Sequence, residues 1–201
     1  MPVNDALASR IDQLAAEIFQ ELHTSKPFIP GQTPIPVTGK FFGAEEIASA
    51  MKASGEFWLT SGPHTENFER EIARKVGVRH AFMVNSGSSA NLVALSTLTS
   101  KKLGDRRLQP GDEVLTVAAG FPTTVAPIIQ NGLVPVYVDI EIGTYVAQSE
   151  LLEEAIGPKT KAIMMAHTLG NPFNLDLVME LAKKHNLWVI EDNCDALGGS
   201  Y

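Results

Sequence analysis

The sequence has a single cysteine, few charged residues and no long apolar run. Of its 201 residues, 19% are charged and only Cys194 is a cysteine. One cysteine cannot form an internal disulfide, and no His/Cys spacing offers a complete metal site, so we expect a reducing, cytoplasmic compartment and no metal bound by this chain. No stretch approaches the ~18 unbroken apolar residues of a membrane span, and the start lacks the apolar segment of a secretory leader.

Basic residues are also scarce, which disfavours nucleic acid as a partner. The formal net charge is −7, and no cluster of Lys or Arg is larger than a pair such as Lys101-Lys102 or Arg106-Arg107. Binding to phosphate backbones needs a basic field, which this chain lacks. The 44% hydrophobic content predicts a globular chain with a real core, and 16 Gly and 12 Pro favour many turns over a coiled coil.

The first part of the chain predicts helices around a proline-rich strip. Apolar residues recur at helical spacing, and expected helices cover residues 5–23, Ala44–Ala53 and Pro63–Lys75. The proline-rich strip runs from Lys26 to Pro36, and Gly77 ends the third helix. We treat residues 1–36 as an N-terminal helix and arm, and residues 37–201 as part of one large domain.

From residue 81 onward, short apolar runs alternate with helical segments. The runs are Ala81–Val84, Glu113–Val117, Val134–Val138, Ala162–Ala166 and Leu187–Ile190. Runs that are apolar on both faces are typical of parallel strands covered by helices on each side. The sequence therefore predicts an α/β fold with one doubly wound, mostly parallel sheet.

The chain stops one loop after its last expected strand. Because a sheet protein rarely ends there, we expect an N-terminal portion of a longer protein, with the sheet incomplete at the C-terminus. A complete small α/β domain is the alternative.

A glycine-serine turn that opens a helix is the first candidate site. Gly87, Ser88 and Ser89 follow the first expected strand, and apolar helical spacing resumes at Leu92. Unpaired N–H groups and serine hydroxyls at a helix N-terminus suit a phosphate monoester. The alternative is a serine cap with no ligand.

The other candidates also follow strands. Asp192, after Glu191, is a carboxylate that a cation such as a protonated pyridine nitrogen could meet, and the alternative is a helix N-cap made by Asp192 or Asp195. Phe121 could stack on a flat ring or belong to the core. The segment with His167 and Asn171 offers polar groups, or only a hydrogen-bonded turn. Carboxyl ends of parallel strands share one edge, so together these residues predict a pyridoxal-phosphate pocket.

The chain resembles the DegT/DnrJ/EryC1/StrS family of fold type I pyridoxal-phosphate enzymes over nearly its whole length. The matching motifs are Leu59–Gly62 with Phe68-Glu69, Ser86–Leu92, Gly111–Val114, Phe121, Val138-Asp139, Thr160–Ile163 and Glu191-Asp192. The resemblance implies that Gly87, Ser88 and Ser89 hold the cofactor phosphate. It also implies that Phe121 stacks on the pyridine ring and that Asp192 pairs with the ring nitrogen.

Asp195 separates two branches of that family. Sugar aminotransferases carry glutamine at this position, whereas an acidic residue resembles the 3-dehydrase branch and its iron-sulfur members. The resemblance then implies pyridoxamine-phosphate-dependent C3 dehydration of CDP-4-keto-6-deoxy-D-glucose in 3,6-dideoxysugar and lipopolysaccharide biosynthesis. It further implies a [2Fe-2S] cluster in the full-length protein, a flavin iron-sulfur reductase as partner, and a homodimer.

In that branch a histidine replaces the usual Schiff-base lysine, and we expect both this catalytic base and the cluster cysteines beyond Tyr201. Cys194 matches no cluster cysteine, and we expect it to be a small buried residue. The alternatives are a nucleotide-sugar aminotransferase and a non-catalytic fragment that retains part of the pocket. We expect the 201-residue chain to be inactive alone.

Overall fold

The computed structural model describes residues 4–24 and 27–200. The chain divides into two compact units, Met1–Met83 and Val84–Tyr201, and each is described by itself. The boundary that we expect between an arm ending at residue 36 and a larger domain stays a prediction. In the part that the structure describes, no helix is both long enough and apolar enough to cross a membrane.

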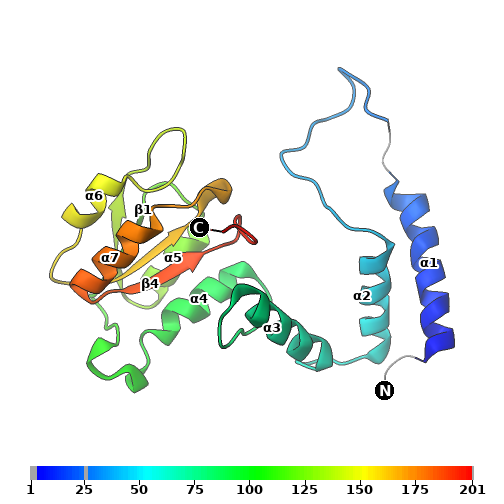
Figure 1. Ribbon diagram of the computed structural model, residues 1–201, viewed down its shortest axis with the longest axis horizontal. Helices are drawn as coiled ribbons and strands as arrows, with labels where there is room; N and C mark the ends of the chain where they lie inside the picture. Colours follow the sequence, from blue (N-terminus) through cyan, green and yellow to red (C-terminus); the bar gives the residue numbers. More distant parts are fainter. Residues whose placement is uncertain (1–3, 25–26, 201) are drawn as a thin grey trace. The chain divides into compact units, whose positions relative to one another are not determined.

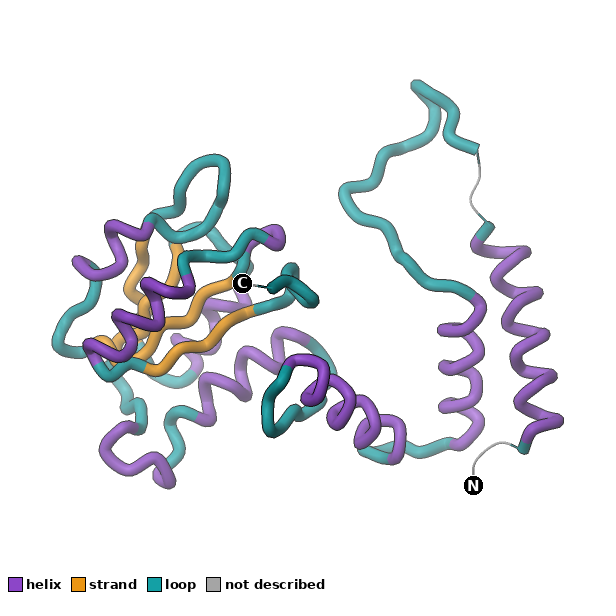
Figure 2. Tube along the Cα trace, in the orientation of Figure 1, coloured by secondary structure: helices purple, strands orange, loops and turns teal. Residues whose placement is uncertain are grey.

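The first unit is helical. Figure 2 shows the helices α1 (Asp5–His23) and α2 (Ala44–Glu56), and residues 27–43 before α2 form a loop. The strip from residue 27 to 36 contains no helix or strand, whereas Lys26 lies outside the described residues. The first helix is confirmed as predicted, and α2 runs three residues beyond the expected Ala53 to a left-handed Phe57 with φ of 52°. The third helix, α3 (Pro63–Val76), ends at Gly77 as predicted.

The prediction of a strand at Ala81–Val84 is wrong. This segment contains no helix or strand, and Phe82 is 82% exposed. The Met83 N–H donates to Glu69 Oε1 at 2.7 Å instead of joining a ladder. An apolar run becomes a strand only where another strand pairs with it, and none of the described strands does so here.

The second unit contains a four-stranded parallel sheet (Figure 1). Its strands are β1 (Glu113–Val117), β2 (Val134–Val138), β3 (Thr160–Ala166) and β4 (Trp188–Asp192), in the order β2-β1-β3-β4. Strands β1 and β2 have the predicted bounds, and β3 begins two residues early. The last strand is shifted, so that Glu191 and Asp192 belong to β4 itself.

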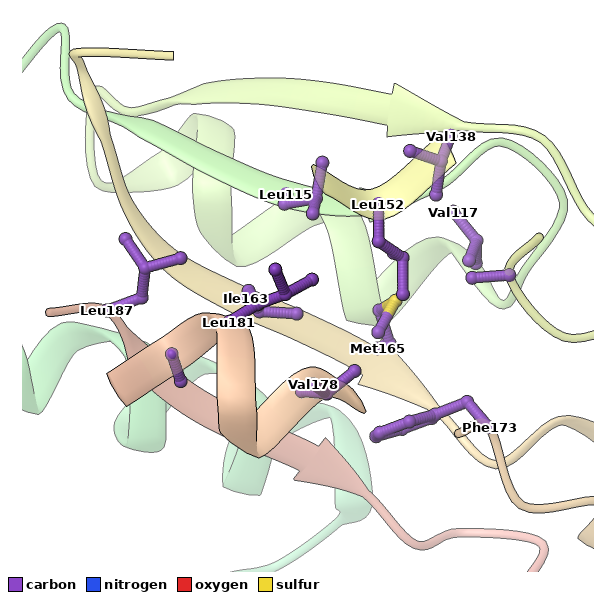
Figure 3. Close-up of a cluster of buried hydrophobic side chains, with 12 residues drawn as sticks. Leu115, Val117, Val138, Leu152, Ile163, Met165, Phe173, Val178, Leu181 and Leu187 are labelled. Carbon is purple, nitrogen blue, oxygen red and sulfur yellow. The ribbon is translucent and has the colours of Figure 1, made fainter. Parts of the chain in front are cut away.

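Helices cover both faces of this sheet. They are α4 (Gly87–Thr97), α5 (Pro122–Gln130), α6 (Ser149–Glu154) and α7 (Leu175–His185), with 3₁₀ turns η1 (Lys101–Arg106) and η2 (Thr168–Gly170). Alternate side chains of the central strands enter two separate cores. Leu115 and Ile163 pack with residues of α6 and α7 (Figure 3), whereas Val114 and Met164 pack with residues of α4 and α5. The predicted doubly wound sheet is confirmed.

Coverage is uneven from strand to strand. The central strands β1 and β3 are almost wholly buried. On the edge strand β2, Val134 and Tyr137 are about half exposed. The expectation of apolar strands covered on both faces therefore holds for the centre of the described sheet but not for its edge.

Candidate cofactor site

A cavity lies at the carboxyl ends of the strands. The chain leaves β1 through α5 for β2 on one side, and β3 pairs on the other side of β1. This reversal of direction is where open α/β sheets bind ligands. The cavity has a volume of about 250 Å³ and is lined by Gly87, Ser88, Asn91, Phe121, Thr123, Ala166, Thr168, Asp192, Cys194 and Asp195.

The N-terminus of α4 forms one wall of the cavity. Ser86 is the N-cap, and its hydroxyl oxygen accepts the Ser89 N–H at 3.2 Å. The N–H groups of Gly87 and Ser88 have no acceptor within their own helix, because the first turn of any helix leaves them unpaired. A Cβ built on Gly87 would meet nothing within 4 Å, so the turn is open to a ligand. Of the two predicted serines, Ser88 lines the cavity and Ser89 does not.

Asp192 places a buried carboxylate in the cavity wall at the end of β4. The residue is 9% exposed. Its Oδ2 accepts hydrogen bonds from Asn91 Nδ2 at 2.7 Å and from Thr124 Oγ1 at 2.8 Å, and its Oδ1 accepts the Cys194 N–H at 3.2 Å. The alternative of a helix N-cap does not apply, because the described residues after Asp192 form turns and no helix.

Asp195 lies in the turn that follows β4. Its Oδ2 accepts the Leu169 N–H at 3.1 Å, and Leu169 has a left-handed backbone with φ of 56°. This bond connects the turn after β4 to η2, which follows β3. Asp195 thus lines the same cavity as Asp192.

Phe121 is exposed at the cavity instead of packed in the core. It is the N-cap residue of α5, and 67% of its surface is accessible. The alternative that Phe121 belongs to the core does not match the structure. An open aromatic face at the mouth of the cavity can stack on a flat ring.

The structure does not bring His167 and Asn171 to this cavity. His167 is 5% exposed, and its ring stacks on Phe173 with centroids 4.2 Å apart. Its Nδ1 accepts the Phe173 N–H at 3.3 Å, so the proton lies on Nε2, which is 3.0 Å from Glu191 Oε2. His167 lines a separate cavity of about 170 Å³, and Asn171 donates to the Thr144 carbonyl at 3.0 Å. Here the alternative of a hydrogen-bonded turn describes the geometry.

Cys194 is exposed, so the expectation of a buried cysteine is wrong. It follows β4 in a turn, where the sheet does not cover it, and it lines the cavity. Within residues 4–24 and 27–200, no group of three or more His, Cys, Asp or Glu side chains is placed to hold a metal ion.

The two side chains that donate to Asp192 Oδ2, Asn91 and Thr124, were missed in the sequence. Asn91 lies four residues after Gly87 and four before the buried Leu95, so it shares their face of α4. A polar residue one helical turn before a large apolar residue, on the side of α4 that faces the core, is the signal that could have identified it. Thr124 offered no comparable signal, because threonine is common near helix starts.

Known proteins resemble this chain closely. The model of the DegT/DnrJ/EryC1/StrS aminotransferase family matches residues 41–201. The chain is 53% identical to the lipopolysaccharide biosynthesis protein RfbH of Salmonella typhimurium LT2, over 97% of the chain and 45% of that protein. It is 49% identical to the dTDP-4-dehydro-2,6-dideoxy-D-glucose 3-dehydratase of Saccharopolyspora spinosa, over 94% of the chain and 42% of that protein.

Solved structures agree with these relatives. The E. coli GDP-4-keto-6-deoxy-D-mannose-3-dehydratase with bound hydrated PLP matches with a TM-score of 0.77 and 32% identity, over 83% of this chain and 42% of that one. The fold expected of pyridoxal-phosphate aminotransferases and dehydrases is thereby confirmed. The chain spans less than half the length of the curated relatives described above. Because the family model matches residues 41–201 and one relative is 53% identical over 97% of the chain, this chain belongs to the DegT/DnrJ/EryC1/StrS aminotransferase family.

Proposed function

We propose that this chain supplies the cofactor-binding part of a pyridoxamine-phosphate-dependent nucleotide-sugar 3-dehydratase. The observation that carries the proposal is the cavity, which brings an open helix N-terminus, an exposed aromatic ring and a buried carboxylate together at one sheet edge. Relatives at 53% and 49% identity support the reaction class, since the second is named a 3-dehydratase. A third relative, 37% identical over 71% of the chain, is named GDP-4-keto-6-deoxy-D-mannose 3-dehydratase.

The residues of the cavity fit pyridoxamine phosphate. The free N–H groups of Gly87 and Ser88, with the Ser88 hydroxyl, would hold the phosphate, and the space beside Gly87 leaves room for it. Phe121 would cover the ring, and Asp192 would meet the ring nitrogen with a negative charge. When bound, the cofactor supplies an electron sink next to the sugar carbon that loses its hydroxyl.

Asp195 favours dehydration over amino transfer. The family resemblance implies a glutamine at this position in sugar aminotransferases, and here a carboxylate lines the cavity, with one oxygen held by the Leu169 N–H. A carboxylate accepts hydrogen bonds only, whereas a glutamine amide also donates, so the two residues present different groups to the cofactor.

The finer proposal follows the resemblance to the iron-sulfur branch. It assigns CDP-4-keto-6-deoxy-D-glucose as the substrate, a [2Fe-2S] cluster and histidine base outside this chain, a flavin iron-sulfur reductase as the electron donor, and a homodimer. The names of similar proteins include dTDP- and GDP-linked sugars, so the nucleotide has to be tested directly.

The test uses the protein expressed from its complete gene and loaded with pyridoxamine phosphate. CDP-, dTDP- and GDP-linked 4-keto-6-deoxyhexoses are incubated with the protein, with and without a flavin reductase and NADH, and products are identified by mass spectrometry. We expect loss of the C3 hydroxyl from the CDP sugar and release of the 3-deoxy product only with the reductase. An amino sugar formed with glutamate would identify an aminotransferase instead, and absence of any product would favour a non-catalytic pocket.

A further inference from the structure

We propose that Asn91 and Thr124 are positioning residues that hold Asp192 in one orientation, so that its Oδ1 is available to the cofactor ring nitrogen. The inference rests on the proposed function, because it needs Asp192 to meet that nitrogen. It assigns a role to two residues for which the sequence alone indicated none. Asn91 lies on α4, Thr124 on α5 and Asp192 on β4.

The two oxygens of Asp192 are in different situations. Oδ2 accepts two short bonds, from Asn91 at 2.7 Å and Thr124 at 2.8 Å, and Oδ1 accepts one longer bond from the Cys194 N–H at 3.2 Å. A carboxylate oxygen accepts about two hydrogen bonds. Oδ2 is therefore saturated by the protein, and Oδ1 is the oxygen that retains capacity for another donor.

The Asn91 amide can be placed in only one way. Its Nδ2 donates to Asp192 Oδ2 and also lies 3.3 Å from the Thr123 carbonyl oxygen, so both of its hydrogens face acceptors. Rotating the amide by 180° would set its own oxygen against these two acceptors. Because Asn91 is 8% exposed, water cannot compensate for such a rotation, and the donor orientation is fixed.

Thr124 holds the carboxylate from the second helix. Its side chain is almost fully buried, and its N–H donates to the Phe121 carbonyl at 3.0 Å in the first turn of α5. The hydroxyl therefore donates to Asp192 from a residue whose backbone is already fixed. The same turn carries Phe121 and Thr123, which line the cavity.

The pair thus couples three parts of the cavity wall. Asn91 connects the helix that begins with Gly87 to both Asp192 and the turn containing Thr123, and Thr124 connects that turn to Asp192. A buried carboxylate with three donors keeps one rotamer at low free-energy cost. Removing either side-chain donor should free Asp192 to turn Oδ1 away from the ring nitrogen.

The test measures cofactor binding and ring protonation in the protein expressed from its complete gene. The variants are Asn91→Ala, Thr124→Val, which keeps the shape of threonine, and Thr124→Ser, which restores the hydroxyl. The readouts are the dissociation constant of pyridoxamine phosphate and the ¹⁵N chemical shift of its labelled ring nitrogen. We expect Asn91→Ala and Thr124→Val to bind about 10- to 100-fold more weakly, the range for lost hydrogen bonds to a charged group. Their ¹⁵N signal should move toward that of the unprotonated ring, and Thr124→Ser should resemble the wild type.

Matched controls lose comparable hydrogen bonds away from the cavity. Asn131 Nδ2 donates to the Pro127 carbonyl and Thr99 Oγ1 to the Ser96 carbonyl, both at 2.8 Å, so Asn131→Ala and Thr99→Val should leave both readouts unchanged. Two results together would overturn the positioning role but not the proposed function. In Asn91→Ala and Thr124→Val, the dissociation constant and the ¹⁵N shift would be those of the wild type, whereas in Asp192→Asn binding would be weaker and the ring nitrogen unprotonated. Equal weakening in the controls would overturn the positioning role as well, because the cause would then be general instability. Unchanged binding in Asp192→Asn would overturn the proposed function, and the positioning role with it.

Discussion

Asp192 is a charged residue that the fold buries and surrounds with donors from its own turn and from two helices. We predict that Asp192→Asn in the complete protein nearly abolishes turnover. An amide can still hydrogen-bond to a ring nitrogen, but it lacks the negative charge that keeps this nitrogen protonated, and breaking a buried charge pair costs about 3–5 kcal/mol. Steady-state rates with saturating cofactor would measure the effect, and a rate near that of the wild type would remove Asp192 from its assigned role.

At the level of single residues, the sequence identified those cavity residues whose place follows from their position at a strand end or a helix start. Gly87, Ser88 and Phe121 lie at helix starts and Asp192 ends β4, and parallel strands bring such positions together at one edge. Asn91 and Thr124 were missed because their hydrogen bonds to Asp192 span 101 and 68 residues. Contacts at such separations depend on how helices cross the sheet, so the helical spacing of Asn91 could indicate that it is buried but not which group it meets.

His167 also follows a strand but does not line the cavity that contains Asp192. It directly follows β3, and yet its ring packs against Phe173 and its Nε2 faces Glu191 instead of the cavity. Adjacent residues at a strand end point to opposite sides. Position after a strand predicts which edge a residue occupies, but not which side of the sheet its side chain takes.

At the level of elements, the two neighbouring serines in the first turn of α4, Ser88 and Ser89, make different contacts. Ser88 lines the cavity, whereas the Ser89 hydroxyl accepts a hydrogen bond from the Ser86 hydroxyl at 3.2 Å. We predict that Ser88→Ala weakens pyridoxamine-phosphate binding by about 1.5–3 kcal/mol, the usual range for a hydrogen bond to a charged group. Ser89→Ala should have a much smaller effect. Titration of each variant by cofactor fluorescence would measure this difference, and equal losses would contradict the placement of Ser89.

A bulky residue at Gly87 should do more harm than either serine change. The position is open now, since a Cβ at Gly87 would have no neighbouring atom within 4 Å, and a phosphate would have to use that space. We predict that Gly87→Val lowers cofactor affinity more than Ser88→Ala while leaving the thermal unfolding midpoint of the complete protein little changed. A large drop in the midpoint would show that the glycine serves the helix instead of the ligand.

The start of α2 in the first unit predicts a pH dependence. Glu46 Oε2 accepts the Gly43 N–H at 2.7 Å, and this bond, with one to the backbone of Glu46 itself, holds the pKa of Glu46 below its ordinary value. A depressed pKa means that the stabilisation is present above the ordinary pKa of the carboxyl group and is lost as the pH falls through the lowered one. Protonation of Glu46 at low pH should therefore lower the helix content of α2, and we predict that Glu46→Gln removes this pH-dependent loss. Circular dichroism between about pH 2 and 7, the range of carboxyl titration, would show it, with Glu45→Gln as control.

Strand prediction succeeded or failed according to pairing. Glu113–Val117 and Val134–Val138 are apolar runs that pair in register, and both strands have the predicted bounds. Residues 81–84 are equally apolar but have no partner among the described strands. Local composition therefore indicates which segments can be strands, and pairing decides which of them are.

At the scale of the whole molecule, the two units differ in how they are stabilised. The second unit has two apolar cores separated by the sheet, and the buried side chains include Leu115, Ile163 and Met164. In the first unit, the buried hydrophobic residues that the structure describes are Ala15, Ala48 and Ala73. Composition predicted a core, but not that it would be concentrated after residue 84, because composition averages over the chain.

The distribution of lysines over the whole chain gives a last prediction. All its lysines lie between Lys26 and Lys184, before Asp192 in sequence, and the lining of the cavity contains no lysine. A lysine that anchored the cofactor would have to reach the ring between Phe121 and Asp192, and no described lysine lines that space. We predict that pyridoxal phosphate followed by borohydride, applied to the complete protein, labels no lysine of residues 1–201 stoichiometrically. Peptide mapping by mass spectrometry would locate any label, with sub-stoichiometric surface labelling as background. One fully labelled lysine within these residues, together with an imine absorbance band, would show that the cofactor binds elsewhere in the chain than at Asp192.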